Sequence, residues 1–404
     1  MKSLRHILRT VVASLTLLLG ACNIYDSYPI DRDPMIDPRS ATLVLHVGIA
    51  SQTRALASNE TMHSLRIVLL DQNNKVEYND FINDTSRKDI FENNGETVDY
   101  SLYNLIKVVP GAKKIFLIAN EESVTGINGG SQTLTNLFDG FNVGDDGFEN
   151  AVNALYFTPD FTKNLVLSAY YEFEVASGAE KVSKEFWLVH AAAKFEFQFI
   201  NNRISDVEIL DLKVNSVADD IYLMPNLDEK EKEKDLPDGG GKVYWIDWLK
   251  AVCDATNANP DLPENKDVNE KYGWIYNYDL PTSATHSQLD IKEKVGSNVS
   301  WVIPGTGSGS NNIVKMPEVY CSESKNPGAD GLHQQYSIDI TVKDEGEDAG
   351  NNTHQFTKTL ENQITLFRNT HAKVTITMSQ DGDLELLIGI CPWYSEDITI
   401  PTFD

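Results

Sequence analysis

The segment Thr42-Leu43-Val44-Leu45-His46-Val47-Gly48-Ile49 decides the fold class of this chain. Its apolar side chains recur at residues 43, 45, 47 and 49, which is the period of a β-strand with one buried face. Similar short apolar runs return along the 404 residues, separated by clusters of Asn, Asp and Gly. Further strands are expected at residues 65–71, 114–120, 165–175, 193–200, 207–214, 301–304, 336–342, 372–378, 384–390 and 398–400.

Helical periodicity is scarce by comparison. Residues 101–108 and 243–252 are compatible with a few helical turns, and the charged run at residues 228–234 is typical of a solvated loop or helix. Many short strands with turns between them predict an all-β protein, with two tandem β-sandwich domains of the transthyretin-like type and few short helices. A faint internal repeat agrees with this, since residues 41–70 and 192–214 both run strand, polar insert, strand.

The charge balance limits the possible partners. The chain has 60 acidic and 34 basic side chains, a formal net charge of −26. Nucleic acids and anionic lipid surfaces both require basic protein surface, so this composition argues against them and fits an extracellular protein.

The N-terminus carries the marks of an export signal. Lys2, Arg5 and Arg9 form a basic start, and residues 7–19 form an apolar core that is shorter than the ~20 residues that a membrane span needs. Leu19-Gly-Ala-Cys22 then resembles a bacterial lipobox, in which the cysteine becomes the acylated N-terminus. An ordinary signal peptide that happens to contain a cysteine is the alternative.

A Pro- and Asp-rich tether at residues 25–39 leads into the first strand, and Ser51-Gln-Thr-Arg54-Ala55 follows that strand at once. Arg54 is a lone basic residue in a polar segment, where a trypsin-like protease could cut. Cleavage between Arg54 and Ala55 would release the lipid, the tether and the first strand. Loss of Leu43, Leu45, Val47 and Ile49 would leave an apolar groove with unpaired edges, which can accept a strand from another chain.

The C-terminus supplies such a strand. Apolar residues alternate in two runs on either side of Cys391-Pro392-Trp393: Leu384, Leu386, Ile388 and Ile390, then Ile398 and Ile400. A terminal extension of this pattern can fill a neighbour's groove, with main-chain hydrogen bonds for affinity and alternate side chains for register. The alternative is that both ends are ordinary terminal strands of their own sandwiches.

No catalytic or metal signature is present in the sequence. The histidines are scattered with no His-x-x-x-His pair, and Gly305-Thr-Gly-Ser-Gly309 has neither a phosphate-loop nor a nucleophile-elbow pattern. Neither an enzyme nor a cofactor is therefore expected. Of the four cysteines, the pairing of Cys253, Cys321 and Cys391 stays open.

Several short motifs, in their order, resemble the fimbrillins, or type V pilins, of anaerobic Gram-negative oral and gut bacteria. They are the lipobox at Cys22, Gln52-Thr-Arg-Ala55, Gly111-Ala-Lys-Lys-Ile-Phe-Leu-Ile-Ala-Asn120, Ala191-Ala-Ala-Lys194-Phe-Glu-Phe, Tyr222-Leu-Met-Pro225, Met316-Pro-Glu318, Leu366-Phe-Arg-Asn-Thr-His371 and Ile390-Cys-Pro-Trp393. One departure is His190, where the family pattern has an Arg.

The resemblance implies a lipoprotein precursor that reaches the outer membrane and cell surface. It implies a signal peptide at residues 1–21, a lipidated propeptide at 22–54, sandwiches at 55–184 and 185–404, and cleavage after Arg54 by an arginine-specific protease. The C-terminal strands of the next subunit, residues 383–404 by match, would then enter the vacated groove. Implied partners are further copies of the chain or other fimbrial subunits, with a host or bacterial surface ligand.

The resemblance leaves open the role of the chain within a fimbria and a rival function outside one. Arg54 and the C-terminal extension favour a polymerising stalk or tip subunit over an anchor, but do not separate stalk from tip. The rival function is a surface lipoprotein that binds a glycan or protein, stays anchored and never assembles. An aromatic-rich stretch at residues 228–300, with Tyr244 and Trp245, is the best candidate for the ligand-facing domain that a tip subunit would need. The alternative, which is the more frequent role of such residues, is core packing.

Overall fold

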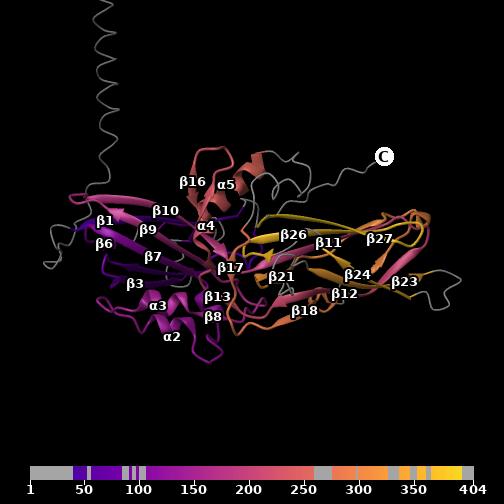
Figure 1. Ribbon diagram of the computed structural model, residues 1–404, viewed down its shortest axis with the longest axis horizontal. Coiled ribbons are helices and arrows are strands. Elements are labelled where there is room, and N and C mark those ends of the chain that lie inside the picture. Colours follow the sequence, from indigo (N-terminus) through magenta and orange to yellow (C-terminus); the bar gives the residue numbers. More distant parts are fainter. Residues whose placement is uncertain are drawn as a thin grey trace, which may run out of the picture. The chain divides into compact units, whose positions relative to one another are not determined.

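The computed structural model describes residues 40–51, 56–83, 91–92, 97–99, 106–258, 275–296, 299–325, 336–345, 353–360 and 365–393. The chain divides into two compact units, Met1–Ser40 and Ala41–Asp404, and every described strand and helix belongs to the second. Strands dominate this unit and its helices are short, which confirms the predicted all-β class (Figure 1). Among the described residues, no helix is both long and apolar enough to cross a membrane.

A nine-stranded sheet forms the first sandwich-like body, in the order β3-β2-β7-β9-β10-β1-β5-β4, with β6 also paired to β1. Its strands are β1 (Ala41–Ile49), β2 (Ser64–Leu70), β3 (Val76–Asn83), β4 (Phe91–Glu92), β5 (Thr97–Asp99), β6 (Ile106–Val108), β7 (Gly111–Ala119), β9 (Leu167–Val175) and β10 (Lys181–His190). Alternate residues of β1, β2, β7 and β9 share one apolar core. The opposite face of β2 and β7 packs on the short helices α2 (Leu134–Phe138) and α3 (Phe148–Asn153).

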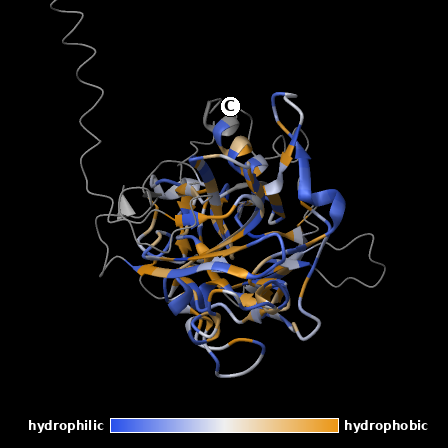
Figure 2. Ribbon diagram, turned by 90° about the vertical axis from the view of Figure 1, so that its left-hand side faces the viewer, coloured by the Kyte–Doolittle hydropathy of each residue, from blue (hydrophilic) through white to orange (hydrophobic). Residues whose placement is uncertain are grey.

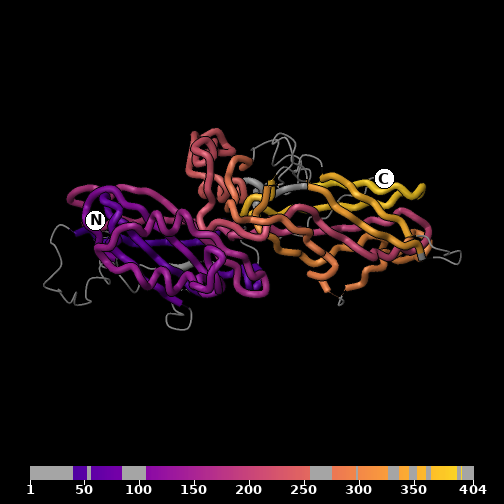
Figure 3. Tube along the Cα trace, turned by 60° about the horizontal axis from the view of Figure 1, so that its bottom comes forward, coloured from indigo at the N-terminus to yellow at the C-terminus, as the bar shows by residue number. Residues whose placement is uncertain are grey.

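Two five-stranded sheets form the second body and enclose a separate core. One has the order β20-β11-β26-β27 with β21 on β11, and the other has the order β18-β12-β23-β24 with β19 on β12. The first contains β11 (Ala193–Asn201), β20 (Ile313–Lys315), β21 (Val319–Cys321), β26 (Thr370–Met378) and β27 (Leu384–Pro392). The second contains β12 (Asp206–Ala218), β18 (His286–Asp290), β19 (Val302–Ile303), β23 (Ser337–Glu345) and β24 (Thr353–Thr359). Figure 3 shows the early strands in indigo and purple and the late strands in orange and yellow as two groups.

The two bodies share one plan of strand pairing. In the first, β1 pairs in parallel with β10 and antiparallel with β5 and β6. In the second, β11 pairs in parallel with β26 and antiparallel with β20 and β21. Each body therefore places its first strand between a late strand and two short middle strands, as the faint repeat suggests. The expected boundary between residues 184 and 185 falls within β10, and it stays a prediction.

An insertion lies in sequence between β12 and β18, two neighbouring strands of one sheet of the second body. Its elements are β14 (Asn226–Leu227), α4 (Glu229–Lys232), β15 (Glu233–Asp235), β16 (Lys242–Tyr244), α5 (Trp245–Ala258) and β17 (Tyr278–Asp279). Apolar residues of α5, among them Trp245, Trp248 and Leu249, join the core of the first body. The remaining described elements are short: η3 (Glu121–Ser123), β8 (Tyr156–Phe157), β13 (Ile221–Tyr222), α7 (Ile291–Val295), η4 (Thr306–Ser308), β22 (Ser324–Lys325) and β25 (Thr365–Leu366).

The structure corrects one helical expectation and adds strands. Residues 106–108 of the expected helical segment 101–108 form strand β6 instead, because Ile106 and Val108 both reach the core while Lys107 faces outward. Residues 100–105 lie outside the described part. The sequence analysis predicted neither β10 nor β24, because many of their residues are polar. Hydropathy colouring shows apolar residues gathered inside the layers of strands (Figure 2).

Candidate functional site

Strand β1 is an interior strand of the first sheet. Leu43, Leu45, Val47 and Ile49 are all buried, with 1%, 0%, 1% and 5% of their surface exposed. Eight residue pairs join β1 to β10, from Thr42 opposite Lys181 to Ile49 opposite Leu188. Gly48 has a specific packing role, because a Cβ at that position would lie 2.5 Å from the ring of Trp187.

The chain on both sides of residues 52–55 is firmly held. Before that segment, Ala50 donates its N–H to the Leu188 carbonyl at 2.7 Å, and its own carbonyl accepts from Asn369 Nδ2 at 2.8 Å. After it, Glu60 is buried. Arg54 and Ala55, the residues of the expected cleavage site, lie outside the described residues, as does Cys22.

Glu60 belongs to a buried polar group that we name the hub: Glu60, His190, Lys194, Asn369 and Trp393. Glu60 Oε1 accepts from Trp393 Nε1 at 3.0 Å and from Lys194 Nζ at 3.2 Å. The Glu60 carbonyl accepts from His190 Nε2 at 2.9 Å. The imidazole of His190 stacks on the indole of Trp393, with ring centroids 4.5 Å apart. All five residues are 0–1% exposed.

Charges in the hub are compensated within it. Burial opposes ionisation of Glu60, but Lys194, His190 and hydrogen bonds outweigh it and hold the pKa of this carboxyl below its ordinary value. Burial lowers the pKa of His190, so its imidazole is neutral at pH 7. Lys194 also lies over the Trp393 ring, 4.6 Å from its centroid. The hub is thus a buried assembly in which the charges of Glu60 and Lys194 are paired.

Asn369 connects the first strand to the C-terminal segment. Its backbone carbonyl accepts from the Trp393 N–H at 2.8 Å, while its side chain contacts Ala50 and His190. It adopts a left-handed backbone conformation, with φ of 61°, which asparagine tolerates better than most residues.

Arg368, next in sequence, ties a further motif to this region. Fully buried, it pairs with buried Glu323 through both ends of its guanidinium. It also donates to the carbonyls of Tyr222 and Leu223, at 2.6 and 2.8 Å. Most of the short motifs that carry the fimbrillin resemblance therefore converge around the hub, which their wide spacing in sequence did not reveal.

The expected donor residues lie partly in β27, the edge strand of its own sheet. β27 pairs along its length with β26, from Leu384 opposite Met378 to Pro392 opposite Thr370. Leu384 is buried, whereas Leu386 and Ile388 are half-buried against the second core. The side chain of Ile390, and all of Ile398 and Ile400, lie outside the described residues. In this structure β1 and β27 are thus both strands of the chain's own sheets, and the donor role stays a proposal.

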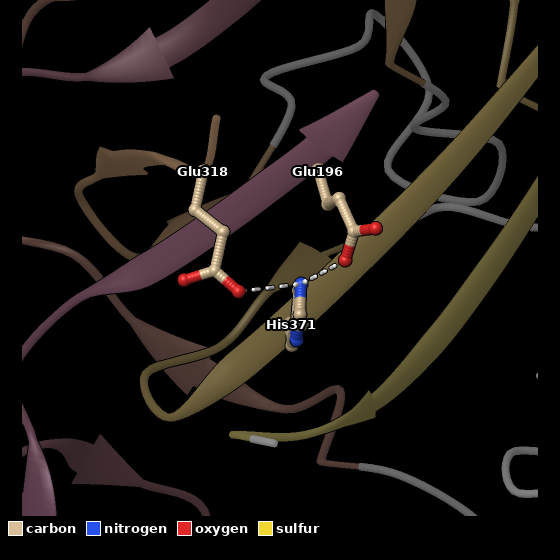
Figure 4. A group of neighbouring side chains, drawn as sticks. All are labelled: Glu196, Glu318 and His371. Atoms are coloured by element: carbon tan, nitrogen blue, oxygen red, sulfur yellow. Dashed lines mark ion pairs between the residues drawn. The ribbon is translucent and has the colours of Figure 1, made fainter. Parts of the chain in front are cut away.

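One group of side chains could hold a metal ion. Glu196, Glu318 and His371 bring donor atoms within 4.8 Å of one another (Figure 4). They come from β11, from the residue before β21 and from β26. Sequence spacing gave no sign of this group, because 175 positions separate Glu196 from His371.

No protein-family model matches this sequence, and no curated protein matches it. Solved structures do. The chain is similar to the tip fimbrial protein Mfa3 from Porphyromonas gingivalis, in a form with a C-terminal truncation, at 12% identity and a TM-score of 0.49, over 88% of this chain and 100% of that one. It is also similar to a fimbrial assembly protein from Parabacteroides distasonis, at 13% identity and a TM-score of 0.43, over 86% and 94% of the two chains.

Fimbrial proteins are therefore among the solved structures that this chain is similar to. At TM-scores below 0.5 the likeness is coarse, and any function must rest on residues of this chain.

Proposed function

We propose that this chain is a structural subunit of a bacterial surface fimbria that supports adhesion. It is exported as a lipoprotein acylated at Cys22, cleaved after Arg54 and polymerised by donor-strand exchange. The observation that carries the proposal is the position of β1, a buried interior strand whose last residue, Ile49, precedes Arg54 by only five positions.

The energetics of β1 explain why its removal demands a replacement. Each of its four aliphatic side chains contributes about 1.5–3 kcal/mol through burial. Their sum, on the order of 6–12 kcal/mol as an upper value, is comparable to the whole stability of a typical domain, about 5–15 kcal/mol. A subunit without β1 would expose an apolar groove between β10 and the pair β5 and β6, with unpaired main-chain groups on both sides.

A strand from another subunit satisfies both needs of this groove. Its main chain replaces the ladder to β10, and alternate apolar side chains replace those of β1. Residues 384–390 and 398–400 have that alternation. β27 is also less firmly held than β1: Leu384 is its only buried side chain among the described positions, and Leu387 is 57% exposed.

The hub supports a maturation role for the same region. Ala50 and Glu60, which flank the cleavage segment, both connect to Trp393, the last described residue before the C-terminal extension. Residues beyond Trp393 can extend to a neighbour with the hub intact, whereas use of residues 384–390 as donor requires β27 to leave β26 and Trp393 to leave the hub.

The test is an arginine substitution with a matched control. Arg54→Ala should block release from the membrane and block polymer formation, as seen in the molecular mass of surface material sheared from cells. Arg39→Ala removes a different arginine of the propeptide, two positions before β1, and should leave assembly unchanged. Normal polymers from the Arg54→Ala variant would contradict the proposal.

A second candidate function is an anchored surface lipoprotein that binds a ligand without assembling. The observation that favours it is a cleft of about 810 Å³ between β9 and the insertion, lined among others by Tyr170, Glu172, Tyr244, Trp245 and Asp247. Its volume is typical of ligand sites, and aromatic faces suit sugars. Under this function, Arg54→Ala would change neither the location nor the size of the protein.

A further inference from the structure

We propose that Glu196, Glu318 and His371 form a binding site for one divalent transition-metal ion of the zinc class. This site is independent of polymerisation. His371 Nε2 lies 3.3 Å from Glu196 Oε2 and 3.6 Å from Glu318 Oε1, and both carboxylates point toward that nitrogen (Figure 4).

The distances match a metal centre with little rearrangement. Zinc binds histidine nitrogen and carboxylate oxygen at about 2.0–2.2 Å, so neighbouring ligand atoms of a tetrahedral site lie about 3.3–3.5 Å apart. Two of the three separations are already near that value. Three protein ligands leave a fourth position for water.

The fold fixes these ligands from three segments. β11 and β26 run in parallel with Lys194 opposite His371, which brings Glu196, two positions further along, to the same outer face of the sheet. Glu318 precedes β21, whose Val319 pairs with Phe195 of β11. Phe195, Val319 and Ala372 point into the core, so the three ligands project from the opposite face.

Burial and exposure divide the roles within the site. The side chain of His371 is only 1% exposed, whereas those of Glu196 and Glu318 are 17% and 31% exposed. The carboxylates therefore give an ion a path from solvent to a nitrogen ligand that is fixed in the sheet.

Two lysines hold the carboxylates and restrict the choice of ion. Lys194 Nζ lies 2.7 Å from Glu318 Oε2, which leaves Oε1 facing His371, and Lys373 Nζ lies 3.8 Å from Glu196 Oε2. The hydrogen bond from Lys194 orients Glu318, as such bonds orient ligands in metal sites, while Lys373 forms an ion pair with Glu196. The ammonium groups also repel any cation that binds by charge alone. Mg²⁺ and Ca²⁺, which need six or more oxygen ligands, are thus excluded, while ions that gain from an imidazole nitrogen are accepted.

The experiment is a zinc titration of the whole purified protein by calorimetry, at pH 7.5 with millimolar Mg²⁺ present, followed by Co²⁺ absorption in the visible range. The expected result is one Zn²⁺ per chain, no effect of Mg²⁺ or Ca²⁺ on the thermal midpoint, and a Co²⁺ spectrum of low coordination number. Glu318→Gln should weaken zinc binding at least tenfold, and His371→Asn should abolish it.

The matched control is Glu208→Gln on β12. The side chain of Glu208 is also 31% exposed and also lies near a lysine, Lys343, but it belongs to the other sheet. The zinc affinity of the Glu208→Gln variant should equal that of the unmodified protein. If the His371→Asn variant fails to fold, the zinc affinity of the Glu318→Gln variant tests the proposal, because the side chain of Glu318 is partly exposed. Absence of stoichiometric zinc binding, or equal affinity in the Glu318→Gln and Glu208→Gln variants, would overturn the proposal.

Discussion

Glu60 Oε1 accepts a hydrogen bond from Trp393 Nε1 at 3.0 Å, although the two residues are 333 positions apart. Glu60 follows the expected cleavage bond by only a few residues, and Trp393 precedes the expected donor extension. The bond therefore joins the two segments that the proposed maturation acts upon. This hydrogen bond predicts that both Glu60 and Trp393 contribute to stability.

Glu60→Gln should destabilise the protein by about 3 kcal/mol, the cost of breaking a buried charge pair. The amide would also place an NH₂ group against the Ala57 N–H, which now donates to Glu60 Oε2 at 3.1 Å. Chemical denaturation measures the effect. Glu122→Gln serves as control, because Glu122 is exposed and accepts from Ser64, and it should cost under about 1 kcal/mol. Equal effects of the two substitutions would contradict the hub's role.

Leu45→Ala should lower the free energy of unfolding of the uncleaved protein by about 2–5 kcal/mol, since it leaves a cavity at a fully buried position of β1. His46→Ala, on the exposed side of the same strand, should change it by no more than about 0.5 kcal/mol. Denaturant midpoints give both values. A Leu45→Ala protein as stable as His46→Ala would mean that β1 does not close the groove.

Removal of residues 394–404 should abolish assembly while the subunit still folds. This truncation keeps Trp393 and every contact of β27 described here. Removal of residues 383–404, in contrast, also deletes buried Leu384 and Trp393, so it cannot separate a donor defect from a folding defect. Size-exclusion and thermal unfolding of the shorter truncation decide the question. A truncated subunit that assembles normally would place the donor strand elsewhere.

The free energy of unfolding should fall as the pH drops below about 6.5. Burial lowers the pKa of His190 and of His371 in the folded protein, so the unfolded chain takes up protons first. The contribution of each histidine to stability is therefore complete above its pKa in the unfolded chain. It is lost as the pH falls toward its pKa in the folded protein. Each histidine contributes a slope of at most about 1.4 kcal/mol per pH unit. The pKa of Glu60 is also lowered, which adds loss of the same sign below its ordinary pKa.

Denaturation curves between pH 8 and pH 5 measure this slope. His190→Gln removes one of the two groups and should make the curve shallower in that interval. A pH-independent stability in the unmodified protein would contradict the neutral, buried state of both imidazoles.

Much of the fold follows from local patterns in the sequence. Strands with one buried face, such as β1 and β26, alternate so regularly that their ends are predicted to within a few residues. β24, with mostly exposed polar side chains, carries no such signal, because its pairing with β23 depends on main-chain bonds. β6 was mistaken for helix because three residues are too few to show a period.

The hub was harder to predict from the sequence than the fold. Lys194, Asn369 and Trp393 lie in three separate short motifs and Glu60 lies in none of them. The pairing of β11 with β26, the bond between Asn369 and Trp393, and the bonds of Glu60 to Lys194 and Trp393 assemble the group. His190 departs from the family pattern, which has an Arg at this position. The structure gives it a specific place, stacked on Trp393 and bonded to Glu60. Such contacts depend on distances across the fold that no local pattern records.

The central claim is that β1 leaves the subunit during assembly, and the N-terminus of the surface protein tests it most directly. High-molecular-weight material sheared from cells should, by mass spectrometry, consist of chains that begin at Ala55 and lack every residue of β1. Polymers whose chains begin at an acylated Cys22 would still contain Leu43, Leu45, Val47 and Ile49, and would contradict donor-strand exchange.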